Sequence, residues 1–270
     1  MHASAKATQR VRAYVEGTVR SLDLPPVHAL VDGMDLQWGD ASIPMTPAYW
    51  AAQTWMWRLD APDHYRLGHT LAEELLACML GGHGIPAEVG LAAYQRLRRA
   101  MHASADRLCD RGAVLTMLTE PLEVGGRPIR YRFAAQKAAY VAEAFSRLPE
   151  LDHDADDITL RNELTRLRGV GPKTASWVLR NLRGSDAVAI LDVHIIRAGL
   201  ALGIFTEADR VERHYDRMEA SYLAFAKAIR APASILDSVI WMTMRQLPST
   251  PPARRGARPS GVPRQHALPL

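Results

Sequence analysis

The stretch LTRLRGVGPKTASWVLRNLRGSDAVAILDVHIIR, residues 164 to 197, decides the fold. Leu160, Leu164 and Leu167 recur at helical spacing, and Asp157 is a suitable N-cap for the helix that they predict. The run RGVGP that follows is too short and too rich in glycine to be anything but a tight hairpin. Pro172 suits the first position of a second helix, whose apolar side carries Ala175, Val178, Leu179 and Leu182. The stretch therefore predicts a helix, a hairpin and a second helix.

The hairpin residues Gly169, Val170 and Gly171 are candidates for binding a phosphate. Glycine lets the backbone come close to a ligand, and the amides at a helix N-terminus favour an anion. On its own, this motif is typical of non-specific binding to the DNA backbone and occurs in many unrelated proteins. It does not establish an enzyme.

Lys173 makes the prediction sharper, because it lies just inside the second helix. The positive end of a helix dipole disfavours an ammonium, and so does partial burial in a cleft. A lysine that has lost its proton is a nucleophile that can attack C1′ of a nucleotide, expel the base and form a Schiff base. Asp192, nineteen residues later, can stabilise the positive charge that develops on the sugar. Asp192 is also well placed as a helix N-cap, and the two roles are compatible.

Length and composition set the outer limits. With 270 residues and 48% hydrophobic content, the chain can form one large domain or two moderate ones. Its two cysteines, Cys78 and Cys109, exclude a disulfide framework and a four-cysteine iron–sulfur cluster. The first residues lack the apolar core of a signal peptide, and no run of residues reaches the length of a membrane helix. We expect a cytoplasmic protein without contact to a membrane.

The net charge of +4 equals the contribution of the segment 248–270, which holds four arginines and no acid. Its Pro/Arg-rich composition predicts a disordered tail that adds salt-sensitive affinity for DNA, a role that its deletion would test. Basic residues also predominate between residues 161 and 200, next to the acidic run LPELDHDADDI. A basic face beside an acidic one suits a protein that binds a polyanion on one side.

The remaining elements are predicted from periodicity and turn residues. Residues 10–22 are interpreted as a helix, and Tyr49, Trp50, Trp55 and Trp57 as an aromatic core cluster. Thr70 and Glu73 form a capping box for a helix over 66–80. Gly125 and Gly126 predict a small β-hairpin, which a helix AAQKAAYVAEAFSRL follows. Helices are expected from residue 157 to Leu247.

The motifs GVGPKTASWVL and AILDVHIIR resemble the helix–hairpin–helix DNA glycosylase superfamily. Within it, RYRFAAQKAAYVAEA and LDSVIWMTMRQ resemble the 8-oxoguanine DNA glycosylase/AP lyases of the compact archaeal-type branch, over roughly residues 65 to 247. The resemblance implies an all-α fold of two helical subdomains with a DNA-binding cleft between them. It also implies a monomer that acts on damaged double-stranded DNA, excises an oxidised purine such as 8-oxoguanine and then cleaves the strand. No cofactor is implied, beyond a possible monovalent cation on the hairpin backbone.

Position by position, the resemblance makes Lys173 the Schiff-base lysine and Asp192 the catalytic aspartate. It assigns phosphate contacts to the hairpin and to His194, which as a lone helical histidine could equally be a cap or a core residue. Trp177 and Trp241 are candidate walls of the base pocket, although tryptophans at helical spacing usually belong to a core.

The chain departs from the family pattern in two places. The segment LGGHGIP offers only His83 as a wedge for the space left by a flipped base, and a structural turn explains it equally well. No lysine follows Lys227, whereas the compact branch uses a C-terminal lysine to recognise the lesion. Two alternatives therefore remain open: action on another modified nucleobase, in DNA, RNA or linked to protein, and a DNA-binding module without catalysis.

The predicted division of the chain has four parts. Residues 1–64 are expected to pack with the C-terminal helices, 65–184 to form the subdomain that ends in the helix–hairpin–helix, and 185–247 to complete the other subdomain. Residues 248–270 form the predicted tail.

Overall fold

The computed structural model describes residues 8–60, 66–82 and 84–247, and these ranges are mostly helical. The α-helices are α1 (Pro47–Asp60), α2 (Leu71–Leu80), α3 (Ala87–Ala103), α4 (Arg111–Thr119), α5 (Ala134–Arg147), α6 (Asp157–Leu164), α7 (Pro172–Arg183), α8 (Val193–Leu202), α9 (Val211–Ala228) and α10 (Ala233–Gln246). Two short 3-10 helices, η1 (Ala105–Leu108) and η2 (Leu148–Glu150), complete the helical part. The prediction of an all-α fold is confirmed. The predicted tail lies outside the described residues.

The helix predicted over residues 10–22 is wrong, because this segment forms an antiparallel hairpin. Strand β1 (Gln9–Val15) pairs with β2 (Thr18–Leu24) over their whole length. Val11, Ala13 and Val15 alternate with more exposed side chains, which is the period of a strand and not of a helix. Glu16 and Gly17 both adopt positive φ, at 49° and 78°, and close a tight two-residue turn between the strands.

The second β-hairpin was predicted correctly. Strands β3 (Leu122–Val124) and β4 (Arg127–Ile129) pair around Gly125 and Gly126, whose φ angles are 56° and 74°. Positive φ at both central positions favours glycine, which explains why the sequence signal was strong.

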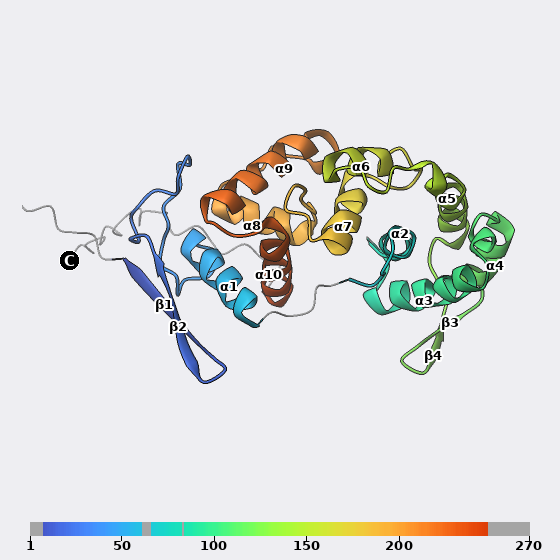
Figure 1. Cartoon of the computed structure of the whole chain (residues 1–270), viewed down its shortest axis with the longest axis horizontal. Coiled ribbons are helices and arrows are strands. Elements are labelled where there is room, and N and C mark those ends of the chain that lie inside the picture. The colour runs from blue at the N-terminus through green and yellow to red at the C-terminus, as the bar shows by residue number, and fades with distance from the viewer. Residues whose placement is uncertain (1–7, 61–65, 83, 248–270) are drawn as a thin grey trace, which may run out of the picture.

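The described residues form two hydrophobic cores, and each core belongs to one lobe. The helices and strands of the two lobes are labelled in Figure 1. The first lobe, residues 66–188, contains α2 to α7 with β3 and β4, and its core includes Leu75, Leu97 and Val178. The second lobe, residues 8–60 and 189–247, contains β1, β2, α1 and α8 to α10, and its core includes Trp50 and Phe225. Of the predicted aromatic cluster, Trp50 is fully buried and Tyr49 and Trp57 pack against this core, whereas Trp55 is half-buried and does not belong to it. Val188 belongs to the core of the first lobe and Ala189 to the core of the second. The domain boundaries predicted from the sequence remain a prediction.

Buried ion pairs join the two lobes. Arg161 on α6 donates from Nη1 to Oε2 of Glu219 on α9 over 2.9 Å, and both side chains are largely shielded from solvent. Arg180 on α7 forms a second ion pair, with Asp237 on α10. In both pairs the first lobe supplies the cation and the second lobe the carboxylate.

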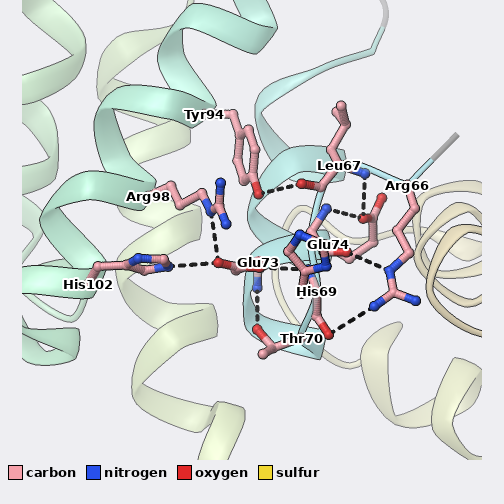
Figure 2. A network of polar contacts seen from close by, with 10 residues as sticks. Arg66, Leu67, His69, Thr70, Glu73, Glu74, Tyr94, Arg98 and His102 are labelled. Atoms are coloured by element: carbon pink, nitrogen blue, oxygen red, sulfur yellow. Dashed lines mark hydrogen bonds and ion pairs between the residues drawn. The ribbon is translucent and has the colours of Figure 1, made fainter.

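The start of α2 is fixed by a dense polar network (Figure 2). Thr70 caps the helix as predicted, accepting from the amide of Glu73 at 3.2 Å. The Glu73 carboxylate accepts from the His69 amide, from Arg98 and from His102, at 2.6 to 2.8 Å. Burial alone would raise the pKa of Glu73, but these hydrogen bonds lower it to about 2.

Glu74 ties α2 to the helix that carries Lys173. Its side chain is fully buried, and one carboxylate oxygen accepts from the amides of Leu67 and Gly68. The other oxygen accepts from Nδ2 of Asn181 on α7 at 2.6 Å. The register of α2 against α7 is therefore set by a hydrogen bond that no solvent reaches.

Candidate active site

The hairpin between α6 and α7 has the form that its glycines predict. Gly169 adopts φ of +82°, and a Cβ at this position would lie 2.1 Å from Cδ2 of Tyr140. The hairpin therefore packs directly against the Tyr140 ring, where only glycine fits. Gly171 differs, because it has a negative φ and its added Cβ would meet open space. The helix before the hairpin, α6, is capped by Asp156 and not by the predicted Asp157. The Asp156 carboxylate accepts from the amides of Ile158 and Thr159 at 3.0 and 3.1 Å.

The hairpin presents backbone amides without an internal acceptor. The buried Val170 anchors it, and its amide donates to the carbonyl of Leu167 at 3.0 Å. Within the part of the chain that the structure describes, the amides of Gly169 and Gly171 have no hydrogen-bond acceptor. Pro172 begins α7 as predicted, so the unpaired amides of the first helical turn follow immediately. This arrangement favours an anion.

Lys173 is the second residue of α7 and is half-buried. Its side chain lines a pocket of about 280 Å³ between α2, α5 and α7. The lining consists of first-lobe residues: Cys78, Met79, Gly81, Gly82, Phe133, Gln136, Lys137, Gly169, Lys173, Thr174 and Trp177. The pocket thus combines an amine, the hairpin and aromatic surface within one lobe, while the predicted cleft between the subdomains remains a prediction.

Lys137 on α5 is a second amine in this pocket, and sequence reasoning did not single it out. Its Nζ donates to the carbonyl of Met79, near the C-terminal end of α2, over 2.5 Å. Burial lowers the pKa of Lys137, and the charge of Lys173 lowers it further. The two lysines are 36 positions apart, so only the scarcity of lysine in the chain could have indicated that they belong together.

Asp192 caps α8, as one of its two predicted roles requires. Its Oδ1 accepts from the amides of His194 and Ile195, at 2.8 and 2.9 Å. Both bonds use the same oxygen, so the cap holds the carboxylate rigidly and leaves Oδ2 without a hydrogen bond among the described residues.

A second carboxylate lies within electrostatic range of Asp192. Burial raises the pKa of Asp237 to about 6; the ion pair with Arg180 opposes this rise, and the negative charge of Asp192 adds to it. Arg180 lies two turns after Lys173 on α7, so this ion pair links the lysine helix to the neighbourhood of Asp192.

The two tryptophans predicted to form a base pocket lie on helices of different lobes. Trp177 lines the pocket of Lys173, and Gly81 lies against its ring. Trp241, on α10, is instead 36% exposed and stacks under the Arg245 guanidinium at 4.7 Å. Its other neighbour is His194, whose ring meets it edge to face with the centroids 6.2 Å apart.

His194 lies two residues after the Asp192 cap, and its buried Nδ1 has no hydrogen-bond partner among the described residues. The candidate wedge His83 lies outside the described residues. In the described part of the chain, no three His, Cys, Asp or Glu side chains come together as a metal site, and no helix is long and apolar enough to cross a membrane.

Solved structures share this fold. The 8-oxoguanine DNA glycosylase of Thermotoga maritima superposes with a TM-score of 0.50 at 24% identity, over 64% of this chain and 78% of that one. A thermostable thymine-DNA glycosylase gives the same TM-score at 15% identity, over 78% of this chain and 92% of its own. At these identities the likeness establishes the fold alone.

Sequence comparison is more specific. The proteins named 8-oxoguanine DNA glycosylase/AP lyase from Metallosphaera sedula and Saccharolobus solfataricus are each 32% identical, over 118 and 126 residues. These matches cover 41% and 42% of this chain, but only 57% and 58% of the length of the relatives. The model of the family described as 8-oxoguanine DNA glycosylase matches residues 70–231, which is more than half of the chain and includes the hairpin, Lys173 and Asp192. The chain therefore belongs to the helix–hairpin–helix family of 8-oxoguanine DNA glycosylases.

Proposed function

We propose that the chain is a bifunctional DNA glycosylase/AP lyase that excises an oxidised purine, 8-oxoguanine in the first place, from double-stranded DNA. The observation that carries this proposal is the position of Lys173. Lys173 lines a pocket and comes directly after a hairpin with unpaired amides. The chain also belongs to the family of 8-oxoguanine DNA glycosylases. The relatives from Metallosphaera sedula and Saccharolobus solfataricus are named 8-oxoguanine DNA glycosylase/AP lyase, which agrees with this assignment.

In the proposed reaction the neutral amine of Lys173 attacks C1′ of the damaged nucleotide. The bond from C1′ to the base breaks, and its electron pair leaves with the base, which takes up a proton. The amine then gives up a proton, the bond from C1′ to O4′ breaks and O4′ takes up a proton, so the sugar ring opens and leaves a protonated Schiff base between Lys173 and C1′. Removal of a C2′ proton lets the bond from C3′ to its phosphate oxygen break, so the strand is cut by β-elimination.

Asp192 is assigned to the charge that develops on the sugar. Its Oδ1 is held by two amides of α8, so the carboxylate does not need to be ordered during the reaction. The free Oδ2 can stabilise positive charge at C1′ and assist the transfer of protons.

The hairpin is assigned to the DNA backbone. The amides of Gly169, Gly171 and the first turn of α7 would hold a phosphate, and Val170 fixes the hairpin in the core. In the described part of the chain, the carbonyls of residues 168–170 also lack hydrogen-bond donors, so they fit a monovalent cation shared with the phosphate. His194, at the start of α8, is the second candidate phosphate contact.

The base pocket and the oligomeric state complete the proposal. A flipped base would enter beside Trp177, while Trp241 and His194 would approach from the second lobe. His83 is the proposed wedge for the gap in the duplex. We propose that the protein acts as a monomer on nucleoid DNA.

Borohydride trapping tests the proposal, because borohydride reduces a Schiff base to a stable bond. Wild type and Lys173→Gln are each incubated with duplexes that contain 8-oxoguanine opposite cytosine, an abasic site, or no damage. The expected result is a covalent band with the 8-oxoguanine duplex that Lys173→Gln abolishes. A band on the abasic duplex alone would move the substrate to another base. Absence of any band with folded wild type would leave a DNA-binding module without catalysis.

A further inference from the structure

Three exposed arginines of the described residues are held against aromatic rings. The pairs are Arg132 on Phe133, Arg168 on Tyr140 and Arg245 on Trp241, with 4.8, 5.4 and 4.7 Å between the guanidinium carbon and the ring centre. These distances lie in the range of a cation–π attraction. Contact with a ring holds the guanidinium in place and leaves its N–H donors free for another acceptor. We refer to these three side chains as the stacked arginines.

The stacked arginines differ from the other well-ordered arginines because none of them has a carboxylate partner among the described residues. Ion pairs are formed instead by Arg10, Arg96, Arg98, Arg147, Arg161, Arg180, Arg183 and Arg217. The carboxylates around the candidate active site accept from other donors; they are Glu73, Glu74, Asp192 and Asp237. Glu143, on the same helix as Tyr140, forms no ion pair in the described part of the chain. The three positive charges are therefore fixed in place but not paired.

In the first lobe, the two rings border the pocket and the hairpin. Phe133 lines the pocket and has a φ of 75°, a backbone conformation that is rare for a bulky residue and recurs at ligand-binding sites. Its ring carries Arg132 at the edge of the pocket. Tyr140 packs against Gly169, so its ring carries Arg168 beside the unpaired amides of the hairpin.

The third pair belongs to the second lobe. Arg245 lies one turn after Trp241 on α10, with its guanidinium over the indole ring. Trp241 also meets the ring of His194 edge to face, and His194 follows the Asp192 cap by two positions. The stacked arginines thus come from both lobes, and each ring either lines the pocket or contacts a residue assigned to DNA.

We propose that the three stacked arginines bind backbone phosphates of duplex DNA around the candidate active site. A phosphate accepts strong hydrogen bonds from a guanidinium, and a side chain already held on a ring loses less freedom when it binds. Phosphate contacts fix the position of a duplex and carry no sequence information, so these arginines place the DNA while the pocket selects the base. This inference rests on the proposed function, because it takes DNA as the partner of the site.

The salt dependence of binding tests the inference without catalysis. The full chain is titrated by fluorescence anisotropy against a labelled duplex with a tetrahydrofuran abasic analogue, and against the undamaged duplex, at several salt concentrations. Arg132→Met, Arg168→Met and Arg245→Met should each lower the slope of log affinity against log salt by about 0.9 on both duplexes, and the triple variant by about 2.7, since each phosphate contact contributes about 0.9.

Two further variants separate a phosphate contact from a general effect of charge or folding. Arg99→Met removes an exposed arginine of α3 that has neither a ring contact nor an ion pair among the described residues, and it should keep the slope of wild type. Arg168→Lys keeps the charge but loses the planar group that fits the ring. It should keep the slope and weaken binding by a similar factor at every salt concentration.

Unchanged slopes in the three methionine variants, shown by thermal melting to be folded, would overturn the inference. An equal loss of slope in Arg99→Met would also overturn it, because any surface cation would then have the same effect. Wild type that binds both duplexes but gives no trapped product would refute the proposed catalysis, and the salt slopes would still decide whether the stacked arginines bind phosphate.

Discussion

The two lobes contribute opposite charges to the centre of the molecule. The first lobe supplies cations: Lys137 and Lys173 in the pocket, and Arg161 and Arg180 at the contact between the lobes. The second lobe supplies carboxylates: Asp192 at the start of α8, and Glu219 and Asp237 as partners of the two arginines. The family model covers residues 70–231 and so omits the β1–β2 hairpin, α1 and the whole of α10. This difference in charge between the lobes indicates a division of roles. We expect the first lobe to supply the proposed nucleophile, Lys173, and the second lobe to supply the carboxylates that face it and that hold the two lobes together.

The largest effect is expected from a change at Asp192, the carboxylate that caps α8 in the second lobe. Asp192→Asn keeps a good N-cap but removes the negative charge, so α8 should remain stable while base release slows by roughly 10²- to 10⁴-fold. Asp156→Asn, the equivalent change at the cap of α6 in the first lobe, should alter neither. Single-turnover base release and thermal melting of both variants check this. Equal rates for the two variants would show that Asp192 is only a cap.

Breaking one ion pair between the lobes should destabilise the whole fold. Glu219→Gln leaves the Arg161 guanidinium buried without its counter-charge, which should cost about 3 to 5 kcal/mol in the free energy of unfolding. Urea denaturation measures the loss. The exposed pair Arg10–Asp23 is the control, and Asp23→Asn should leave the urea midpoint in place. A similar small effect for Glu219→Gln would mean that the lobes do not depend on this pair.

The hairpin glycines offer a comparison within the first lobe. Gly169→Ala would need a left-handed backbone and would overlap the Tyr140 ring, so we expect a loss of roughly 2 to 3 kcal/mol in stability together with weaker DNA binding. Gly171→Ala meets open space and should be nearly neutral for stability. Urea denaturation and DNA titration of both variants test this. If both alanines are tolerated, the hairpin does not need its present shape.

The smallest effects concern pH, where a buried carboxylate from each lobe should act in opposite directions. The pKa of Glu73 is lowered to about 2, so its contribution to stability is present above its unfolded value of 4.5 and is lost as the pH falls towards 2. The pKa of Asp237 is raised to about 6, so the folded state holds its proton more tightly and stability falls as the pH rises from about 4 to 6.

Unfolding measured against pH separates these two contributions. Glu73→Gln should flatten the curve below pH 4.5, and Asp237→Asn should flatten it between pH 4 and 6. Parallel curves for wild type and Asp237→Asn in that range would argue against the effect of Asp192 and burial on Asp237.

The sequence was sufficient where chemistry is local. The hairpin at Gly169, the start of α7 at Pro172 and the caps at Thr70 and Asp192 each depend on a few neighbouring residues, and all have the predicted geometry. The β1–β2 hairpin was missed because a period of two was taken for a helix, although Gly17 marks its turn. The places of Lys137 in the pocket and of Asp237 beside Arg180 could not be predicted, because their partners lie 36 and 57 positions away and depend on how the helices pack.

The most direct test of the central claim is to locate the covalent bond. Wild-type protein is trapped with borohydride on 8-oxoguanine DNA, digested with protease and nuclease, and mapped by mass spectrometry. With 4 lysines in the chain, the assignment is unambiguous. We expect the reduced sugar on Nζ of Lys173 alone. A sugar on Lys137, or on any other amine, would contradict it.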